Sequence, residues 1–158
     1  MQRTDLPIES GSGSVVADDS LSPFEQARIG EIFDPFEYVI TQEMLDEYRA
    51  LVENPTAAYP TVAGRHALRA WTNRYGAVAL ANVGAECEYF NPVVAGKRIH
   101  VEAKIVDKYE RRGKPFVIVD SVAVDEDGRL IEKSRLIGLS SWKGQKLFAE
   151  VHKKWEAA

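Results

Sequence analysis

The chain has 158 residues, a formal net charge of −4 and mixed acidic and basic side chains, which favours a single domain and excludes a nucleic-acid-binding stripe. Its one cysteine, Cys87, excludes an internal disulfide and indicates a reducing compartment; we expect a small buried strand residue there rather than a nucleophile. No apolar run approaches the roughly 20 residues of a membrane span, and the first residues lack the basic and apolar blocks of a secretion signal. We therefore expect a cytoplasmic protein without nucleic-acid or membrane partners.

The N-terminal part of the chain predicts an arm, a strand and a short helix. Residues 1–22 are rich in Gly, Ser and Asp, which is typical of a flexible arm. The hydrophobic run Ile29–Ile40, which contains the turn residues Asp34-Pro35, predicts a strand. Thr41 then occupies an N-cap position. Apolar residues follow it at the spacing of an amphipathic helix: Met44, Leu45, Tyr48, Leu51 and Val52.

The most informative segment, Glu53–Trp71, is rich in turn residues and leads into a second helix. Asn54-Pro55 and Tyr59-Pro60 each place a residue before proline, which disfavours the α conformation there. The apolar pattern predicts a helix that begins near Gly64 or Arg65 and continues to Leu80. The first turn of such a helix presents unpaired N–H groups and a positive dipole end, which suit a carbonyl or an anion.

The remainder of the chain predicts an antiparallel sheet and a terminal helix. Four strand-like segments follow the central helix: Ala85–Phe90, Ile99–Asp107, Lys114–Val124 and Arg129–Ser141. Arg112-Gly113 and Asp127-Gly128 are turn signals that join the last three strands as hairpins. Residues 143–158 predict an amphipathic helix. Helices followed by a meander indicate an α+β domain over residues 23–142, with the apolar helix wrapped by the sheet.

Four segments together resemble the MaoC-like acyl dehydratase and (R)-specific enoyl-CoA hydratase family. The segments are ITQEMLDEYRALVENP, YPTVAG opening a helix, YFNPVVAGKRIHVEAKIVD and RRGKPFVIVDSVAVDEDGRLI. The resemblance implies a hotdog fold, in which a long helix is wrapped by a curved antiparallel sheet, and a dimer with one continuous sheet. It also implies an acyl group carried as a thioester on coenzyme A or acyl carrier protein, with no other cofactor.

The same resemblance implies an acid/base pair that this chain does not carry at the usual positions. Members that hydrate or dehydrate use an aspartate and a histidine that flank Asn-Pro. The aspartate position is Val52 here, with Glu53 beside it, and the histidine position is Ala57. A second histidine, common before the helix glycine, is replaced by Ala63.

Three residues near this loop are candidates for catalysis. His66, in the first turn of the central helix, suits a general base, although a helix-surface or core histidine is the alternative. Glu53 can replace the missing aspartate if it points inward; otherwise it is a solvated residue at a helix end. Asn54 can orient water, but capping the turn would also explain it.

Three further residues are candidates for substrate binding, and none for a metal. Tyr59 can donate to an acyl carbonyl or simply pack in the loop. Gly64 and Arg65 offer backbone N–H groups to a thioester carbonyl, and the Arg65 side chain can meet a phosphate or face solvent. The histidines lack zinc-ligand spacing. Solvated surfaces are the expected explanation for the remaining charged groups: Glu86 with Glu88, and Lys108, Arg111, Arg112 and Lys114.

Three functions follow in order of preference. The first is a hydro-lyase acting on enoyl or 3-hydroxyacyl thioesters, with His66 or Glu53 as base. The second is a non-catalytic acyl-thioester module, or the supporting subunit of a heteromeric dehydratase whose partner supplies the acid/base pair. The third is an acyl thioesterase, which needs a carboxylate near the central helix. No residue in the predicted helix from Arg65 to Leu80 is acidic, so this function is ranked last.

Overall fold

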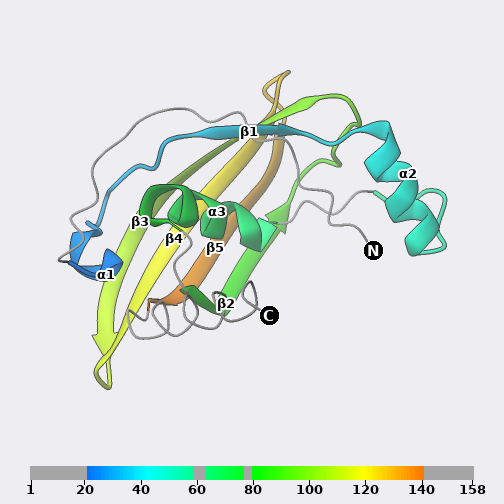
Figure 1. Cartoon of the computed structure of the whole chain (residues 1–158). Helices are drawn as coiled ribbons and strands as arrows, with labels where there is room; N and C mark the ends of the chain where they lie inside the picture. Colours follow the sequence, from blue (N-terminus) through cyan, green and yellow to red (C-terminus); the bar gives the residue numbers. More distant parts are fainter. Residues whose placement is uncertain (1–20, 59–62, 77–79, 141–158) are drawn as a thin grey trace, which may run out of the picture.

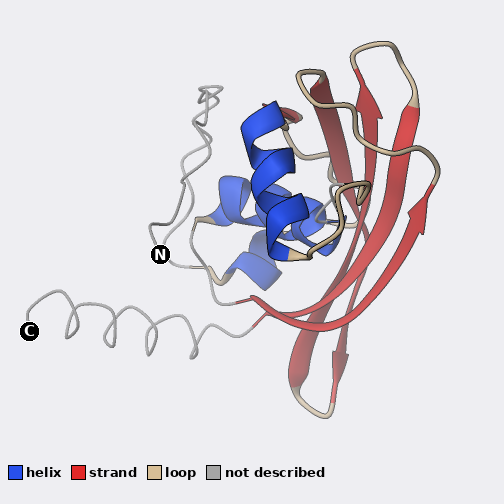
Figure 2. Ribbon diagram, turned by 90° about the vertical axis from the view of Figure 1, so that its right-hand side faces the viewer, coloured by secondary structure: helices blue, strands red, loops and turns tan. Residues whose placement is uncertain are grey.

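The computed structural model describes residues 21–58, 63–76 and 80–140, and over these the chain forms a curved sheet with helices on its concave side. Figure 1 shows the longest helix, α3, lying across the middle of this sheet, and Figure 2 shows the helices on one side of it. All strand pairs are antiparallel, in the order β1-β3-β4-β5-β2. The strands are β1 (Phe36–Val39), β2 (Leu80–Tyr89), β3 (Arg98–Arg111), β4 (Lys114–Asp125) and β5 (Leu130–Ser140).

Two of the helices in the described part of the chain begin directly after a side-chain N-cap. The short α1 (Pro23–Gln26) was not predicted; it starts after Ser22, which forms a capping box with Glu25. The predicted N-cap of α2 (Gln42–Leu51) is confirmed, since the Thr41 hydroxyl accepts from the Met44 amide at 3.2 Å. The third helix, α3 (Ala63–Tyr75), begins close to the predicted start.

Two predicted boundaries are wrong, each for a local reason. The strand expected over Ile29–Ile40 is reduced to β1 and one isolated bridge from Ile32 to Lys104. The residues between these two parts include Pro35, which has no backbone N–H to donate to a neighbouring strand. The central helix ends at Tyr75 and does not reach Leu80. The next residue, Gly76, has φ +82°, the left-handed conformation that terminates helices. Leu80 instead begins β2, whose bulge between Asn82 and Gly84 interrupts the alternating pattern that identifies a strand.

The main core lies between α3 and the concave face of the sheet. Trp71 is fully buried and packs edge-on against Phe33, with ring centroids 6.5 Å apart. Ala67 and Ala70 share the inner face of the helix, and their small side chains let its backbone approach the strands closely. Buried residues of β3, β4 and β5 complete the core: Ala103, Ile105, Val117, Val119 and Leu136. The predicted central helix wrapped by a sheet is confirmed.

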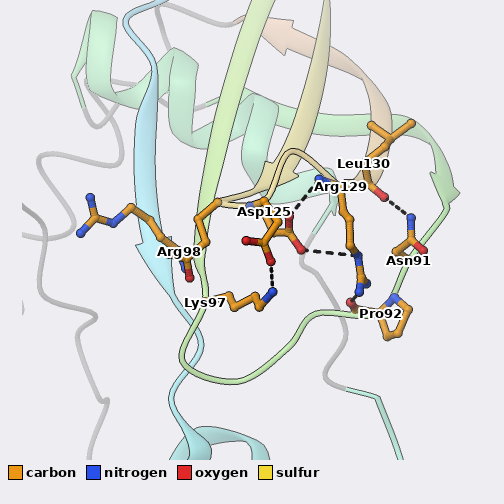
Figure 3. A network of polar contacts seen from close by, with 9 residues as sticks. Asn91, Pro92, Lys97, Arg98, Asp125, Arg129 and Leu130 are labelled. Carbon is orange, nitrogen blue, oxygen red and sulfur yellow. Dashed lines mark hydrogen bonds and ion pairs between the residues drawn. The ribbon is translucent and has the colours of Figure 1, made fainter.

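A polar network at one end of the sheet holds the loop before β3 against the β4–β5 hairpin (Figure 3). The buried Asp125 carboxylate accepts from the backbone amides of Asp127 and Arg129 at 3.1 and 2.9 Å. The Arg129 guanidinium donates to the Pro92 carbonyl at 3.2 Å. Gly128 has φ +77° and closes the turn, so the predicted Asp127-Gly128 hairpin is confirmed.

Replacing Asp125 with alanine is expected to destabilise the protein by about 2 kcal/mol, because two backbone amides at a part-buried turn lose their acceptor. Denaturant unfolding measures the effect. The matched control is Asp127→Ala, whose carboxylate forms an exposed ion pair with Lys97, expected to contribute about 0–1 kcal/mol. Equal losses for the two variants would contradict this role for Asp125.

Several predicted features lie outside the described residues: most of the N-terminal arm, Tyr59, His152 and the helix over residues 143–158. Within the ranges that the structure describes, no helix is long and apolar enough to cross a membrane.

Candidate functional site

His66 lies in the first turn of α3, where it is 4% exposed and contacts two polar side chains from different strands of the sheet. Its Nε2 is 2.7 Å from the hydroxyl of Tyr38 on β1. Its Nδ1 contacts Oε1 of Glu132 on β5 as a buried ion-pair neighbour. We call these three residues the Tyr38–His66–Glu132 triad.

The strand pattern explains why both partners face the helix. Side chains of β5 alternate, so Glu132, Ser134 and Leu136 are buried while Lys133 and Arg135 are exposed. Glu132 is paired with Ala123 of β4 and with Tyr89 of β2. The small Ala123 side chain leaves the Glu132 carboxylate uncrowded on that side. On β1, Phe36 and Tyr38 are the two less exposed positions of the strand.

The surroundings of the two ring nitrogens indicate which of them faces a donor and which faces an acceptor. A phenol donates readily to an unprotonated ring nitrogen, and a carboxylate accepts from a protonated one. We therefore assign the ring proton to Nδ1, facing Glu132, and leave Nε2 to accept from Tyr38. Both carboxylate oxygens of Glu132 and Nδ1 of His66 are buried without a hydrogen-bond partner, so the Nδ1–Oε1 contact is an ion-pair contact. An incompletely satisfied buried carboxylate is costly to stability and is frequent at functional sites.

The three side chains differ in access to solvent. Glu132 is 0% exposed and His66 is 4% exposed, whereas Tyr38 is only half-buried. The Phe36 ring meets the His66 ring edge-on, with centroids 6.2 Å apart, and so shields the imidazole from water. A polar chain thus runs from a buried carboxylate to a phenol nearer the surface.

Cys87 on β2 corrects one expectation from the sequence. It lies in a strand, as predicted, but it is exposed rather than buried, because β2 is an edge strand that α3 covers only in part. Partial desolvation raises the pKa of the thiol, and the Glu132 carboxylate raises it further. A raised pKa lowers the fraction of thiolate, which is the nucleophilic form of cysteine.

Glu53 and Asn54 lie at the end of α2, in a different place from His66. Figure 1 shows α2 beyond one end of the sheet, whereas α3 lies against its middle. Glu53 is exposed with φ +54°, and both residues line a shallow surface hollow with Asp46, Arg49, Ala50 and Pro55. The Asn54 carboxamide oxygen accepts from the Thr56 amide and hydroxyl, each at 3.0 Å, which is the turn-capping alternative. Neither residue contacts the triad.

Gly64 and Arg65 occupy the first turn of α3, immediately before His66. Amides in the first turn of a helix have no intrahelical acceptor, so these N–H groups are suited to a carbonyl oxygen. The Arg65 side chain is exposed. Gly64, Arg65 and His66 therefore lie together at one helix start, and their roles in binding and catalysis stay a prediction.

The other charged side chains considered in the sequence analysis contact or lie opposite other groups of the protein. Glu86 and Glu88 are paired across strands with Arg135 and Lys133 on an exposed face. Lys108 donates to two backbone carbonyls, those of Phe24 and Ala27. His100 lies between Glu37 and Glu102 at the surface. Within the described ranges, no three His, Cys, Asp or Glu side chains form a group able to hold a metal ion.

Neither Tyr38 nor Glu132 was predicted as a site residue, although the sequence pattern around Glu132 contains a signal for it. In the run LIEKSRLIGLS, alternate residues from Glu132 onward are Ser, Leu, Gly and Ser, which mark an inward face. A glutamate in phase with that face is a charged residue at a core position, which is rare without a partner. Nothing comparable singles out Tyr38, since an aromatic residue on a strand usually packs.

Neither protein-family models nor curated proteins match this chain, but solved structures do. A MaoC-like dehydratase from Rhodospirillum rubrum aligns with a TM-score of 0.59 and 16% identity, over 73% of this chain and 94% of that one. The chain has a hotdog fold. A HadBC (3R-hydroxyacyl-ACP dehydratase) complex from Mycobacterium tuberculosis aligns with a TM-score of 0.56 and 17% identity, over 71% of this chain and 96% of that one. A thioesterase superfamily member from Thermus thermophilus aligns with a TM-score of 0.55 and 22% identity, over 83% of this chain and 97% of that one.

These matches confirm the predicted resemblance to MaoC-like proteins at the level of the fold. Identities of this size leave the reaction of this hotdog chain to be argued from its own residues. At two positions where the resemblance implies acid/base groups, the structure has Val52 at the exposed C-cap of α2 and Ala57 in the following loop. The only histidine buried among the described residues is His66.

Proposed function

We propose that this hotdog protein is an acyl-thioester hydro-lyase that adds water to enoyl thioesters or removes it from 3-hydroxyacyl thioesters. The observation that carries the proposal is the Tyr38–His66–Glu132 triad, which places a buried imidazole with an orienting carboxylate at the start of the central helix. An acid/base group beside the backbone amides of a helix's first turn is what such a reaction needs.

The two parts of the site have different tasks in this proposal. The Gly64 and Arg65 amides donate to the thioester carbonyl oxygen and stabilise the enolate oxygen that develops in the transition state. His66 provides the acid/base chemistry, and Glu132 holds its tautomer and stabilises the charged imidazolium. This pair replaces the aspartate and histidine of the MaoC-like pattern with residues from α3 and β5. Glu53 and Asn54, on α2, have no part in it.

The acyl group is proposed to arrive as a thioester of coenzyme A or acyl carrier protein, and the active form is proposed to be a dimer. Support for a second hotdog chain comes from β2, an edge strand with Val83 and Tyr89 exposed to 53% and 63%. The matched HadBC structure is itself a complex of hotdog chains. A homodimer and a heterodimer with a related chain both satisfy these observations.

The direct test is an assay of the purified protein with crotonyl and longer enoyl thioesters, following the loss of the conjugated enoyl absorbance. The wild type is expected to hydrate at least one of them. His66→Gln is expected to lower the rate about 10²–10⁴-fold, the usual contribution of a positioned general base. His100→Gln, a surface histidine with two carboxylate neighbours, is the matched control and should retain the wild-type rate.

A wild-type protein that turns over none of these thioesters, alone or with a related hotdog chain, would refute the hydro-lyase proposal. Binding without turnover would favour the second candidate, a non-catalytic acyl-thioester module. The observation favouring that candidate is Val52 and Ala57 at positions where MaoC-like hydro-lyases carry acid/base groups.

Thioesterase activity gains one supporting observation from the structure. The helix itself has no acidic residue, but β5 supplies the Glu132 carboxylate against it. Full burial of Glu132 behind His66 argues against direct activation of water by this group, so the thioesterase remains the third candidate. Release of free thiol from a saturated acyl thioester would distinguish it from the hydro-lyase.

A further inference from the structure

We infer that Tyr38, rather than His66, is the group that exchanges protons with the reacting water and substrate. This inference deepens the proposed hydro-lyase function and rests on it. Both ring nitrogens of His66 are engaged, Nε2 with the Tyr38 hydroxyl at 2.7 Å and Nδ1 with Glu132. An imidazole enclosed in this way has no ring nitrogen directed at a substrate.

The burial of the triad points in the same direction. Exposure increases from Glu132 through His66 to Tyr38, so the phenol is the member closest to where a substrate can lie. The Phe36 ring covers the imidazole edge-on from the same strand that carries Tyr38. Tyr38 also lies on β1, an edge strand of the sheet, on the opposite side from the edge strand β2.

The proton transfers balance without any co-reactant. As water attacks the β-carbon of the enoyl thioester, one water proton passes to the Tyr38 oxygen and the phenol's own proton passes to His66 Nε2. The imidazolium is then paired with the Glu132 carboxylate, and the thioester carries an enolate. Return of the proton from Nε2 to Tyr38 lets the phenol protonate the α-carbon. The product is the 3-hydroxyacyl thioester, and every residue regains its starting form.

A purely structural triad would also join α3 to β1 and β5, so the experiment needs a readout that anchoring does not affect. The variant is Tyr38→Phe, which keeps the ring and removes only the hydroxyl. Tyr109→Phe is the matched control, because that ring stacks on Phe116 at 5.3 Å at the far end of β3. For each protein, hydration kinetics, the unfolding midpoint and exchange of the substrate α-hydrogen with D₂O are measured.

Tyr38→Phe is expected to lower kcat and α-hydrogen exchange together by about 10²–10⁴-fold, with KM changed less than about threefold and the fold intact. Tyr109→Phe should match the wild type. If Tyr38→Phe has the same kcat and the same rate of α-hydrogen exchange as the wild type, the inference is overturned and the proposed hydro-lyase function is unaffected. A wild-type protein that hydrates no enoyl thioester would overturn both, so the two failures are distinguishable.

Discussion

Replacing Glu132 with glutamine is expected to lower the rate of enoyl-thioester hydration about 10²–10⁴-fold while the protein remains folded. Glutamine has the shape of glutamate, so its carboxamide can occupy the same place beside His66 Nδ1 and leave the ring orientation unchanged. The negative charge that stabilises the imidazolium is lost, and this charge matters most when the imidazolium forms. Glu132 is thus a positioning and charge-stabilising residue that acts through His66.

Two measurements separate this role from a structural one. The pH profile of kcat should change, since the base is no longer coupled to a carboxylate. Cys87 is a second reporter: Glu132 contributes to the raised pKa of its thiol, so removing the charge should lower that pKa and accelerate alkylation near neutral pH. The chain has no other cysteine, so the signal is unambiguous.

The matched control is Glu102→Gln, a carboxylate exposed on β3 beside His100. It should leave hydration and Cys87 alkylation unchanged. Wild-type kcat in a folded Glu132→Gln protein would remove Glu132 from the proposed mechanism. Unchanged alkylation would mean that the carboxylate does not influence the thiol.

Replacing Trp71 with alanine is expected to destabilise the protein by about 3–5 kcal/mol, the largest effect on stability that we anticipate. Trp71 is 0% exposed and packs against Phe33 and Tyr75, with the Tyr75 ring centroid at 4.6 Å. Its removal opens a cavity between α3 and the sheet. Denaturant unfolding followed by circular dichroism measures the loss.

Trp71→Phe is the informative companion variant. The indole N–H is buried without a hydrogen-bond partner, so losing it costs nothing in hydrogen bonding. The expected loss is therefore about 1–3 kcal/mol, well below that of alanine. Equal losses for the two variants would mean that the indole makes a polar contact that outweighs its packing.

In the candidate site, the sequence predicts the residues that are neighbours on one helix, but not which residues of other elements lie beside them. Gly64, Arg65 and His66 were found because they are neighbours on one helix, and helix starts have recognisable turn and proline signals. Glu53 and Asn54 were grouped with them from family spacing, yet they lie at the end of α2 and contact other residues. Closeness in the sequence across a loop does not determine closeness in space.

Tyr38 and Glu132 show the opposite case. They are 28 residues before and 66 residues after His66 in the numbering, and only strand pairing brings them to it. Register decides which face of a strand a side chain takes, and a shift of one residue would expose Glu132. Alternation predicts an inward position for it, but not which helix residue it meets.

The sequence by itself determined the hairpin at Asp127-Gly128, the N-cap at Thr41 and the central helix wrapped by an antiparallel sheet. Each of these depends on residues close together in the chain, where periodicity, capping and turn conformation act. Only the tertiary structure decided that His66 lies between Tyr38 and Glu132. That arrangement depends on how α3 packs across β1 and β5, and so on contacts between residues far apart in the sequence.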